Sequence, residues 1–472
     1  MRRTALRHLV LAVAALAVPL PSLDAQSHSR DNETGVWALV NARIETVTRG
    51  TIDRGTIVIR NGIIEAVGAT VNPPADARVM DLSGKTIYPA FIDLTSSMGL
   101  PQPQPQQGRG GGRAGIPPQV AALFGQQEEE GPRVVGLEPA RSVATELTFV
   151  DSIVRRARDH GIGTVLVSPS RGLFRGQSAL VPLREDTAAR WIVKSPVALH
   201  VGYQTVPGQY PGSLLGVIAY QRQALYDAQR HATVMDRYMA NPRGMVRPAH
   251  NEDLDALVPV VKGTLPIFIA ANSENEILRA LALGKEFGIK LHVVGAVEGY
   301  RTIDALKGTA SPIVSVDFPT PQQSTGWQYQ YATRRDPADS AAVRTAALKV
   351  IEGNAAALNG AGIKFALASG GLAGNTFMEN VRKAIAAGLP RNVAVEALTI
   401  RAAEVAGVDA LLGSIETGKA ANLLVMQGEA LTTTGLLEKV FVDGLQYDVV
   451  PAPAGRGGRG GRANTPPPMR ED

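Results

Sequence analysis

Short apolar runs alternate with amphipathic stretches through the middle of this 472-residue chain. Rich in Val, Ile and Leu, the runs predict strands, and apolar residues recurring every three to four positions predict helices such as 217–238 and 275–287. Strands alternating with helices over 89–405 predict an α/β fold, a parallel (β/α)8 TIM barrel. The predicted strands are 164–167, 179–181, 197–201, 267–271, 291–294, 313–316 and 365–368.

Both flanks of this region have a different, strand-only pattern. Residues 36–88 contain four β-rich runs separated by glycine turns, at 37–40, 55–60, 63–67 and 79–82. Asn61-Gly62 is a strong hairpin signal, and Asp443-Gly444 repeats it where 422–449 return to strands. We therefore expect 36–88 and 406–450 to form one composite β-sandwich domain.

Residues 1–25 have the pattern of a secretory signal peptide. Arg2, Arg3 and Arg7 precede an apolar run at 9–20, and Leu23-Asp24-Ala25 offers a small-residue cleavage site with a cut after Ala25. The run has about a dozen apolar residues, fewer than the roughly 20 needed to span a bilayer. The sequence therefore predicts periplasmic or secreted localisation and no membrane span. It has no cysteine, so no disulfide framework is expected.

Two segments have low-complexity composition. Residues 101–118 are rich in Pro, Gln and Gly, and residues 451–472 form a Gly/Arg/Pro-rich tail. Arg-Gly runs can bind RNA, but a flexible linker and a disordered tail are the simpler interpretation for an exported chain. The net charge of +5 comes mostly from the signal segment and this tail, so the body is near neutral and no nucleic-acid partner is expected.

Candidate chemistry begins at residues 89–100, Pro-Ala-Phe-Ile-Asp-Leu-Thr-Ser-Ser-Met-Gly-Leu. This segment resembles the first barrel strand of the amidohydrolase superfamily, Pro-Gly-Phe-Ile-Asp-x-His-x-His. The resemblance extends over most of 37–450, with further matches at 80–93, 397–425 and 438–444, and is closest to the imidazolonepropionase-like branch, which has exported members. It implies a (β/α)8 barrel with a composite β-sandwich and metal-assisted hydrolysis of C–N bonds.

The metal-ligand positions of that family are degenerate in this chain. The two histidines of the first strand correspond to Thr95 and Ser97, the histidine of a middle strand to Ala270, and the aspartate of the last strand to Gly370. None of these is a good zinc ligand. The remaining family ligand is a strand-end lysine or histidine, for which His200 and His292 are the nearest candidates.

Seven histidines occur, and the six beyond His8 never stand at i,i+2 or i,i+4. A metal site built from distant strands stays open, although a buried structural role is the simpler interpretation for His200 and His292. A serine nucleophile would need an adjacent base with an orienting partner, which the sequence does not reveal. Asp93 is expected to hold geometry rather than to move protons. The candidate pocket residues are Asp93, Ser96, His200, His292 and Ser369.

The sequence thus predicts an exported amidohydrolase-family protein that has lost its metal site. Its expected role is non-catalytic: binding a small molecule, or serving as a subunit beside an active amidohydrolase relative. The alternative is an active hydrolase of non-peptide or small cyclic amides with a relocated or single metal, and zinc is expected only under that alternative. A homo- or hetero-oligomer is expected in either case.

Overall fold

The computed structural model describes residues 35–101, 136–185, 191–205, 210–318 and 337–449. The predicted signal peptide and C-terminal tail lie outside these residues, as does nearly all of the 101–118 segment. In the part of the chain that is described, no helix is both long and apolar enough to cross a membrane.

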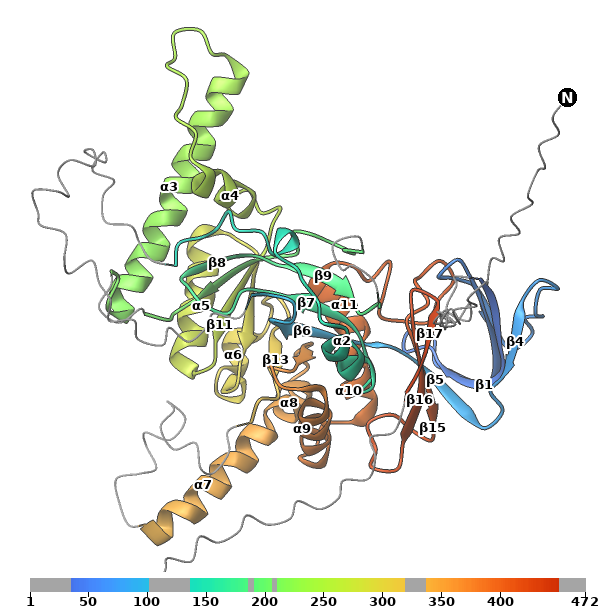
Figure 1. The fold of residues 1–472 in the computed structure, drawn as a ribbon. Coiled ribbons are helices and arrows are strands. Elements are labelled where there is room, and N and C mark those ends of the chain that lie inside the picture. The colour runs from blue at the N-terminus through green and yellow to red at the C-terminus, as the bar shows by residue number, and fades with distance from the viewer. Residues whose placement is uncertain (1–34, 102–135, 186–190, 206–209, 319–336, 450–472) are drawn as a thin grey trace, which may run out of the picture. The chain divides into compact units, whose positions relative to one another are not determined.

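Nine strands form two sheets in the middle of the chain, which we call the central sheets (Figure 1). In one, β6 (Phe91–Ser96) pairs in parallel with β7 (Ile162–Val167), and β9 (Ala179–Pro182) pairs antiparallel to β7. In the other, five parallel strands are followed by antiparallel β8 (Phe174–Gln177). The five are β10 (Leu199–Gly202), β11 (Ile267–Ala271), β12 (Leu291–Gly295), β13 (Ile313–Ser315) and β14 (Ala366–Ala368).

The mixed α/β architecture agrees with the sequence prediction, with one correction. The run at 179–181 forms β9, but it is antiparallel to its neighbour and therefore is not a strand of a parallel barrel. It runs back along β7 because only a short turn-like segment containing β8 separates the two, and a parallel return needs a longer crossover. Among the described residues, the backbone ladders form two sheets and do not join them into a closed ring.

Helices follow most of the parallel strands, and α5 (Glu274–Phe287) shows why they form where they do. Ser273 and Glu276 make a capping box at its start, and Gly288 ends it in a left-handed conformation with φ of 63°. The other helices are α2 (Asp151–Arg158), α3 (Leu214–Ala240), α4 (Glu252–Val261), α6 (Ile303–Leu306), α7 (Pro337–Glu352), α8 (Asn354–Gly360), α9 (Gly374–Ala386), α10 (Arg391–Leu398) and α11 (Ile400–Ala406).

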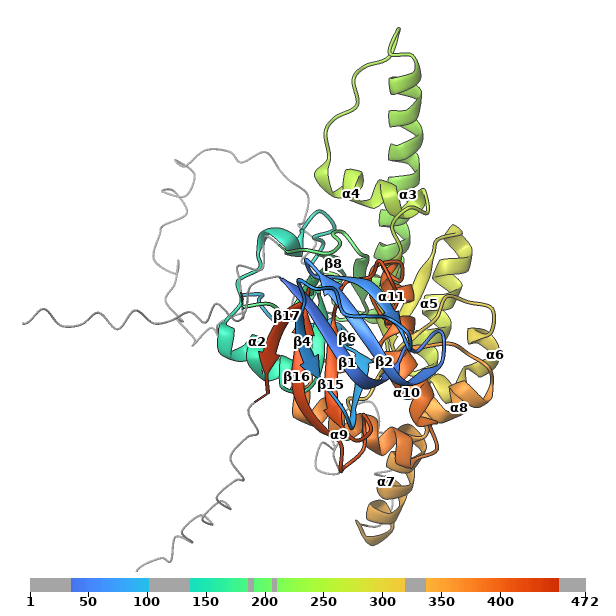
Figure 2. The ribbon, with the colours of Figure 1, turned by 90° about the vertical axis from the view of Figure 1, so that its right-hand side faces the viewer.

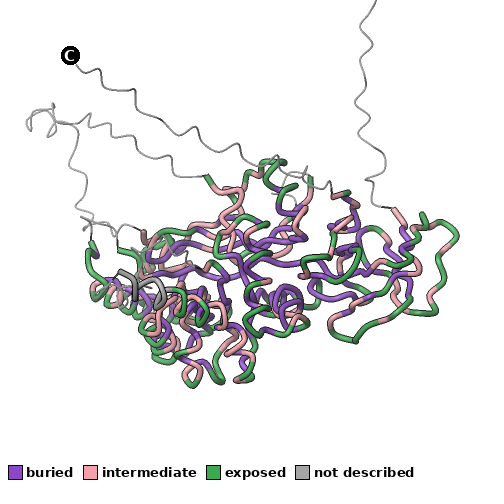
Figure 3. Tube along the Cα trace, turned by 90° about the horizontal axis from the view of Figure 1, so that it is seen from below, coloured by how far each residue is buried: buried purple, intermediate pink, exposed green. Residues whose placement is uncertain are grey.

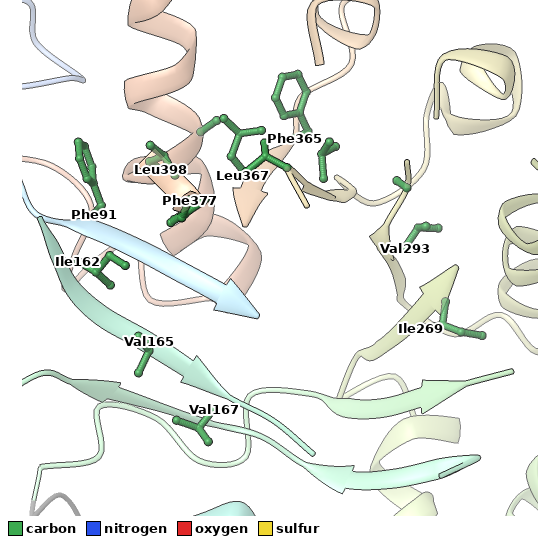
Figure 4. Close-up of a cluster of buried hydrophobic side chains, with 14 of the residues drawn as sticks. Phe91, Ile162, Val165, Val167, Ile269, Val293, Phe365, Leu367, Phe377 and Leu398 are labelled. Atoms are coloured by element: carbon green, nitrogen blue, oxygen red, sulfur yellow. The ribbon is translucent and has the colours of Figure 1, made fainter. Parts of the chain in front are cut away.

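Alternation along the strands divides the buried side chains into two clusters. Val165, Ile269 and Val293 belong to a cluster that also holds helix residues such as Phe377 (Figure 4). Their neighbours in sequence, such as Leu166 and Phe268, belong to a second cluster. This period-two division is expected of strands that are covered on both faces.

The chain's N- and C-terminal strands join in one eight-stranded sheet, the terminal sheet (Figures 1 and 2). Antiparallel pairing of β5 with β15 links its two halves. The predicted hairpin turn at Asn61-Gly62 lies between β2 and β3, with φ of 50° and 84°. Its strands are β1 (Val36–Glu45), β2 (Thr51–Arg60), β3 (Ile63–Gly68), β4 (Arg78–Asp81), β5 (Lys85–Pro89), β15 (Leu423–Gln427), β16 (Leu436–Val442) and β17 (Leu445–Asp448).

The terminal and central sheets share buried structure. Tyr88 and Leu424 of the terminal sheet belong to the same hydrophobic cluster as Phe91 and Val165. The buried Arg158 lies 3.7 Å from the ring centroid of Tyr447 and donates to the carbonyl of Leu183. Figure 3 shows buried chain running through both regions. The described residues from 35 to 449 accordingly belong to one compact unit.

Candidate functional site

A cavity of about 420 Å³ lies at the carboxyl ends of the parallel strands. Both central sheets contribute to its lining, which comes from the ends of β6, β7, β10, β11, β12, β13 and β14. Loops at this end of parallel strands are where α/β folds place their ligands. The lining residues include Thr95, Ser96, Ser97, Ser168, Ser170, Arg175, His200, Phe268, Ala270, Asn272, Val294, Gly295, Ser315, Asp317, Gly370 and Gly371.

All four degenerate ligand positions line this one cavity. Thr95 and Ser97 stand at the end of β6, Ala270 near the end of β11, and Gly370 just after β14. Two hydroxyls, a methyl group and a bare backbone therefore stand where the family resemblance places three histidines and an aspartate. Within the described residues, no three or more His, Asp, Glu or Cys side chains are grouped so that they could hold a metal ion.

Position 370 differs from the family pattern in its backbone as well. Gly370 has a φ of 70°, in the left-handed region that side chains rarely adopt. A Cβ built there would lie 2.4 Å from Ser315 Oγ and 2.8 Å from Asp317 Cβ. The space that an aspartate would need is thus filled by residues of the β13 end.

Asp93 lies beneath the cavity and joins the first and last parallel strands. Its carboxylate accepts hydrogen bonds from Ser369 N at 2.9 Å and Ser369 Oγ at 2.7 Å. Thr95 N and Oγ1 also point to Asp93 Oδ1, at 3.2 and 3.3 Å, and Gly370 N donates to Thr95 Oγ1 at 2.8 Å. We call Asp93, Thr95 and Ser369 the strand joint. It links β6 to β14 through side chains, where the structure shows no backbone ladder between them.

Full burial raises the pKa of Asp93 above its ordinary value, and the hydrogen bonds from Ser369 and Thr95 offset part of that shift. Asp93 and Ser369 are 4% and 1% exposed, and neither lines the cavity. Both residues are placed to hold the ends of β6 and β14 together. Ser96 and Ser97 do line the cavity, but the described hydrogen bonds pair neither serine with a histidine.

The structure separates the two candidate histidines. His200 lines the cavity, and its Nε2 is buried without a hydrogen-bond partner. His292 does not line it and stands near the start of β12, where its Nδ1 bonds the carbonyl of Ser311 at 2.9 Å. Phe268 stands between the two rings, 5.5 Å from one and 5.2 Å from the other. Burial lowers the pKa of His200 to about 3 and that of His292 to about 4, so both are neutral at pH 7.

Sequence reasoning missed Arg175, which carries the positive charge of the cavity. Its side chain is only 9% exposed, and burial lowers its pKa to about 10, so it remains protonated at pH 7. Nothing in the sequence marks this arginine: it stands in a Phe-Arg-Gly-Gln run with no clear strand pattern. Asp317 was missed for a similar reason, because it stands beyond the last apolar residues of the 313–316 run.

Comparison with known proteins shows what this chain is similar to. Residues 261–450 match the family model described as the amidohydrolase family. The crystal structure of an amidohydrolase from Thermotoga maritima MSB8 matches with a TM-score of 0.67 and 21% identity, over 87% of this chain and 98% of that one. The A. niger ochratoxinase structure matches with a TM-score of 0.51 and 12% identity, over 88% and 96%. No curated protein matches the sequence.

Residues 261–450 are thus similar to the amidohydrolase family, and the chain shares its fold with these solved structures. Membership of the superfamily, and of a particular branch within it, stays a prediction. The donor set around the cavity does not fit the metal that the superfamily implies, because the four ligand positions offer no imidazole or carboxylate.

Proposed function

We propose that this protein is a non-catalytic, small-molecule-binding member of the amidohydrolase superfamily. The two central sheets are, in this proposal, parts of the superfamily's (β/α)8 barrel, with the cavity at its carboxyl end. The observation that carries the proposal is the combination of a retained cavity with Thr95, Ser97, Ala270 and Gly370 in its lining. The cavity supports binding, and the missing donors argue against hydrolysis.

The free energy that a bound metal contributes to water activation explains why we favour binding over catalysis. A bound metal lowers the pKa of water from 15.7 to about 7, which corresponds to roughly 12 kcal/mol of nucleophile activation. A neutral hydroxyl at position 95 or 97 cannot replace that term. A serine nucleophile would require a base with an orienting partner, and His200, the histidine of the lining, has no hydrogen-bond partner at Nε2.

Metal analysis of the purified chain tests the proposal. We expect far less than one equivalent of zinc, manganese, iron, cobalt or nickel after purification without chelators. We also expect no hydrolysis of small linear or cyclic amides that a chelator suppresses. The Thermotoga maritima amidohydrolase, purified in parallel, serves as the comparison for metal recovery.

The rival function, an active C–N hydrolase with a relocated or single metal, predicts the opposite result. One equivalent of bound metal, together with amide turnover that is lost on chelation and regained on adding metal back, would overturn the non-catalytic proposal. Mutating His200 to Gln would then show whether this histidine contributes to the metal site, with His231→Gln, outside the cavity, as the matched control.

Export is a separate proposal that rests on the charged start, the apolar run and the small-residue site of residues 1–25. We expect N-terminal analysis of protein recovered from outside the cytoplasm to begin at Gln26. An intact Met1 on that material would contradict it. A partner role beside an active relative, and the oligomer that it implies, would be tested by size-exclusion chromatography with and without that relative.

A further inference from the structure

The Arg175 guanidinium fills the space beside Gly202 of β10, where any other residue would place a side chain. Gly202 ends β10, and a Cβ added at this glycine would lie 2.0 Å from Arg175 Nη2 and 2.6 Å from its Cζ. The guanidinium therefore lies against the bare backbone of Gly202, at the end of a strand that points into the cavity. A side chain of any size at position 202 would displace it.

Among the described residues, no acidic side chain pairs with this guanidinium. Its described hydrogen bond is a 3.3 Å contact from Nε to the carbonyl of Gly172, and none of the described ion pairs includes it. The other buried arginine of the described residues is paired: Arg158, which is 2% exposed, donates to Glu185 at 2.6 Å. An unpaired buried charge is costly for stability, so its retention indicates a partner from outside the chain.

The rest of the lining fits the body of a small polar molecule. The hydroxyls of Ser97 and Ser315 and the amide of Asn272 can donate and accept hydrogen bonds, and Phe268 and Val294 add apolar surface. His200 adds a buried Nε2 without a partner. The other charged group of the lining is Asp317, which stands at the exposed side of the cavity.

Building on the binding function proposed above, we propose that Arg175 binds the carboxylate of a small organic acid in this cavity. The fork of guanidinium donors matches the two oxygens of a carboxylate, and the volume of about 420 Å³ restricts the ligand to small molecules. Gly202 is a positioning residue, because it makes room for the guanidinium without touching the ligand itself.

Calorimetry and thermal unfolding with defined probes test this assignment. The probes are benzoate, glutamate, succinate and a series of N-acetyl amino acids, with benzamide and N-acetyl amino acid amides as uncharged counterparts and inorganic phosphate as a second anion. We expect at least one carboxylate to bind and to raise the melting temperature, and its uncharged counterpart to bind at least tenfold more weakly. Phosphate binding without carboxylate binding would overturn the carboxylate assignment, and so would failure of every carboxylate.

The variants separate a ligand-binding arginine from a structural one. Arg175→Met should lose carboxylate binding by at least tenfold while the ligand-free melting temperature stays equal or rises, because an unpaired buried charge has been removed. Gly202→Ala should weaken binding while the arginine is retained, and Arg171→Met, at an exposed neighbour, should change neither. Unchanged binding in Arg175→Met, or a large fall in its ligand-free melting temperature, would overturn the inference.

These results are independent of the test for catalysis. Carboxylate binding to a chain that proves to contain metal would retain the anion site and reject the non-catalytic function. A metal-free chain that binds no carboxylate would reject the anion site and retain the non-catalytic function.

Discussion

At the scale of single residues, Asp93 shows how a buried carboxylate can hold two strand ends together. Asp93 matches the aspartate of the superfamily's first-strand motif, whereas Thr95 and Ser97 stand at the positions of its two histidines. Its carboxylate accepts hydrogen bonds from Ser369 and Thr95, and these bonds give it a structural role that needs no catalysis. Retention of an acidic residue in such a frame is therefore weak evidence for activity.

Replacing Asp93 should destabilise the protein without affecting metal content. Asp93→Ala leaves the Ser369 and Thr95 amides without their acceptor, and we expect a loss of about 2–4 kcal/mol in the free energy of unfolding, with Asp93→Asn losing about half as much. Urea unfolding at pH 7 measures the loss. Asp53→Ala, at an exposed position of β2, is the control and should change stability by less than about 0.5 kcal/mol.

Equal stability of Asp93→Ala and the parent chain would mean that the strand joint contributes nothing. The asparagine variant separates charge from hydrogen bonding, since it keeps one acceptor and cannot ionise.

The candidate site could be located from sequence but not fully described. Thr95, Ser97, Ala270 and Gly370 were found because each stands at a fixed place in a motif, and the structure brings all four to one cavity. Arg175 could not be found, because its burial depends on Gly202 from another strand. His292 was a candidate from its strand alone, and only the register shows that it stands near the start of that strand.

At the scale of elements, the turn after β14 differs from what a metal site requires. Gly370 and Gly371 both have left-handed φ values, 70° and 94°, but only the first is crowded. Gly370 faces Ser315 and Asp317, whereas no atom lies within 4 Å of a Cβ at Gly371. An aspartate at position 370 would therefore require Ser315 or Asp317 to move.

The two glycines provide a matched pair of substitutions. Gly371→Ala should lose about 1 kcal/mol of stability from the backbone conformation, and Gly370→Ala about 2–4 kcal/mol, because overpacking against Ser315 adds to it. Thermal and urea unfolding measure both. Equal losses would show that Ser315 and Asp317 move aside at little cost. Gly370→Asp would then be a realistic step toward a metal site.

The partly buried carboxylate of Glu416 holds the segment between α11 and β15 in place. It accepts from Ser414 Oγ at 2.6 Å and Thr48 Oγ1 at 2.7 Å, and it pairs with Lys419 at 3.3 Å. These hydrogen bonds, with that of Ser414 the largest cause, lower the pKa of Glu416 to about 2. The carboxylate thus connects this passage to the turn between β1 and β2.

A depressed pKa makes this contribution depend on pH in a defined direction. The stabilisation is fully present above the ordinary pKa of 4.5 and is lost as the pH falls toward about 2. We expect Glu416→Gln to lose about 1–2 kcal/mol at pH 7, a value reduced by the partial exposure of the carboxylate. The difference from the parent chain should shrink in urea unfolding at pH 3. Glu404→Gln, at an exposed helical position, is the control for the substitution itself and should change stability at pH 7 by less than about 0.5 kcal/mol.

Strands with dense apolar runs could be predicted closely, and those set by neighbours could not. The predicted 267–271 coincides with β11, because its five residues are all apolar and follow a proline. β8 was missed, because Phe174–Gln177 contains a glycine and two polar residues and is a strand only through pairing with β10. The antiparallel direction of β9 could not be predicted either, because the length of the connection to β7 sets it and the apolar residues of the strand do not.

At the scale of the whole molecule, the terminal and central sheets share one hydrophobic cluster. We therefore expect a single cooperative unfolding transition. With Trp191 and Trp327 replaced by Phe, the fluorescence of Trp37 reports the terminal sheet, and far-UV circular dichroism reports mostly the helices of the central region. The two midpoints in urea should coincide. Separate midpoints would show that the terminal sheet is an independent folding unit.

The strand joint also constrains the order in which the chain can fold. Asp93 and Ser369 are 276 positions apart, so almost the whole central region must be present before they can meet. Contacts of such long range form late, because the entropy of closing the loop is lost before any bond repays it. Until then the Asp93 carboxylate is hydrated and ionised, and the end of β6 has no side-chain link to β14. The last strand of the central sheets therefore completes the burial of a charged group on the first.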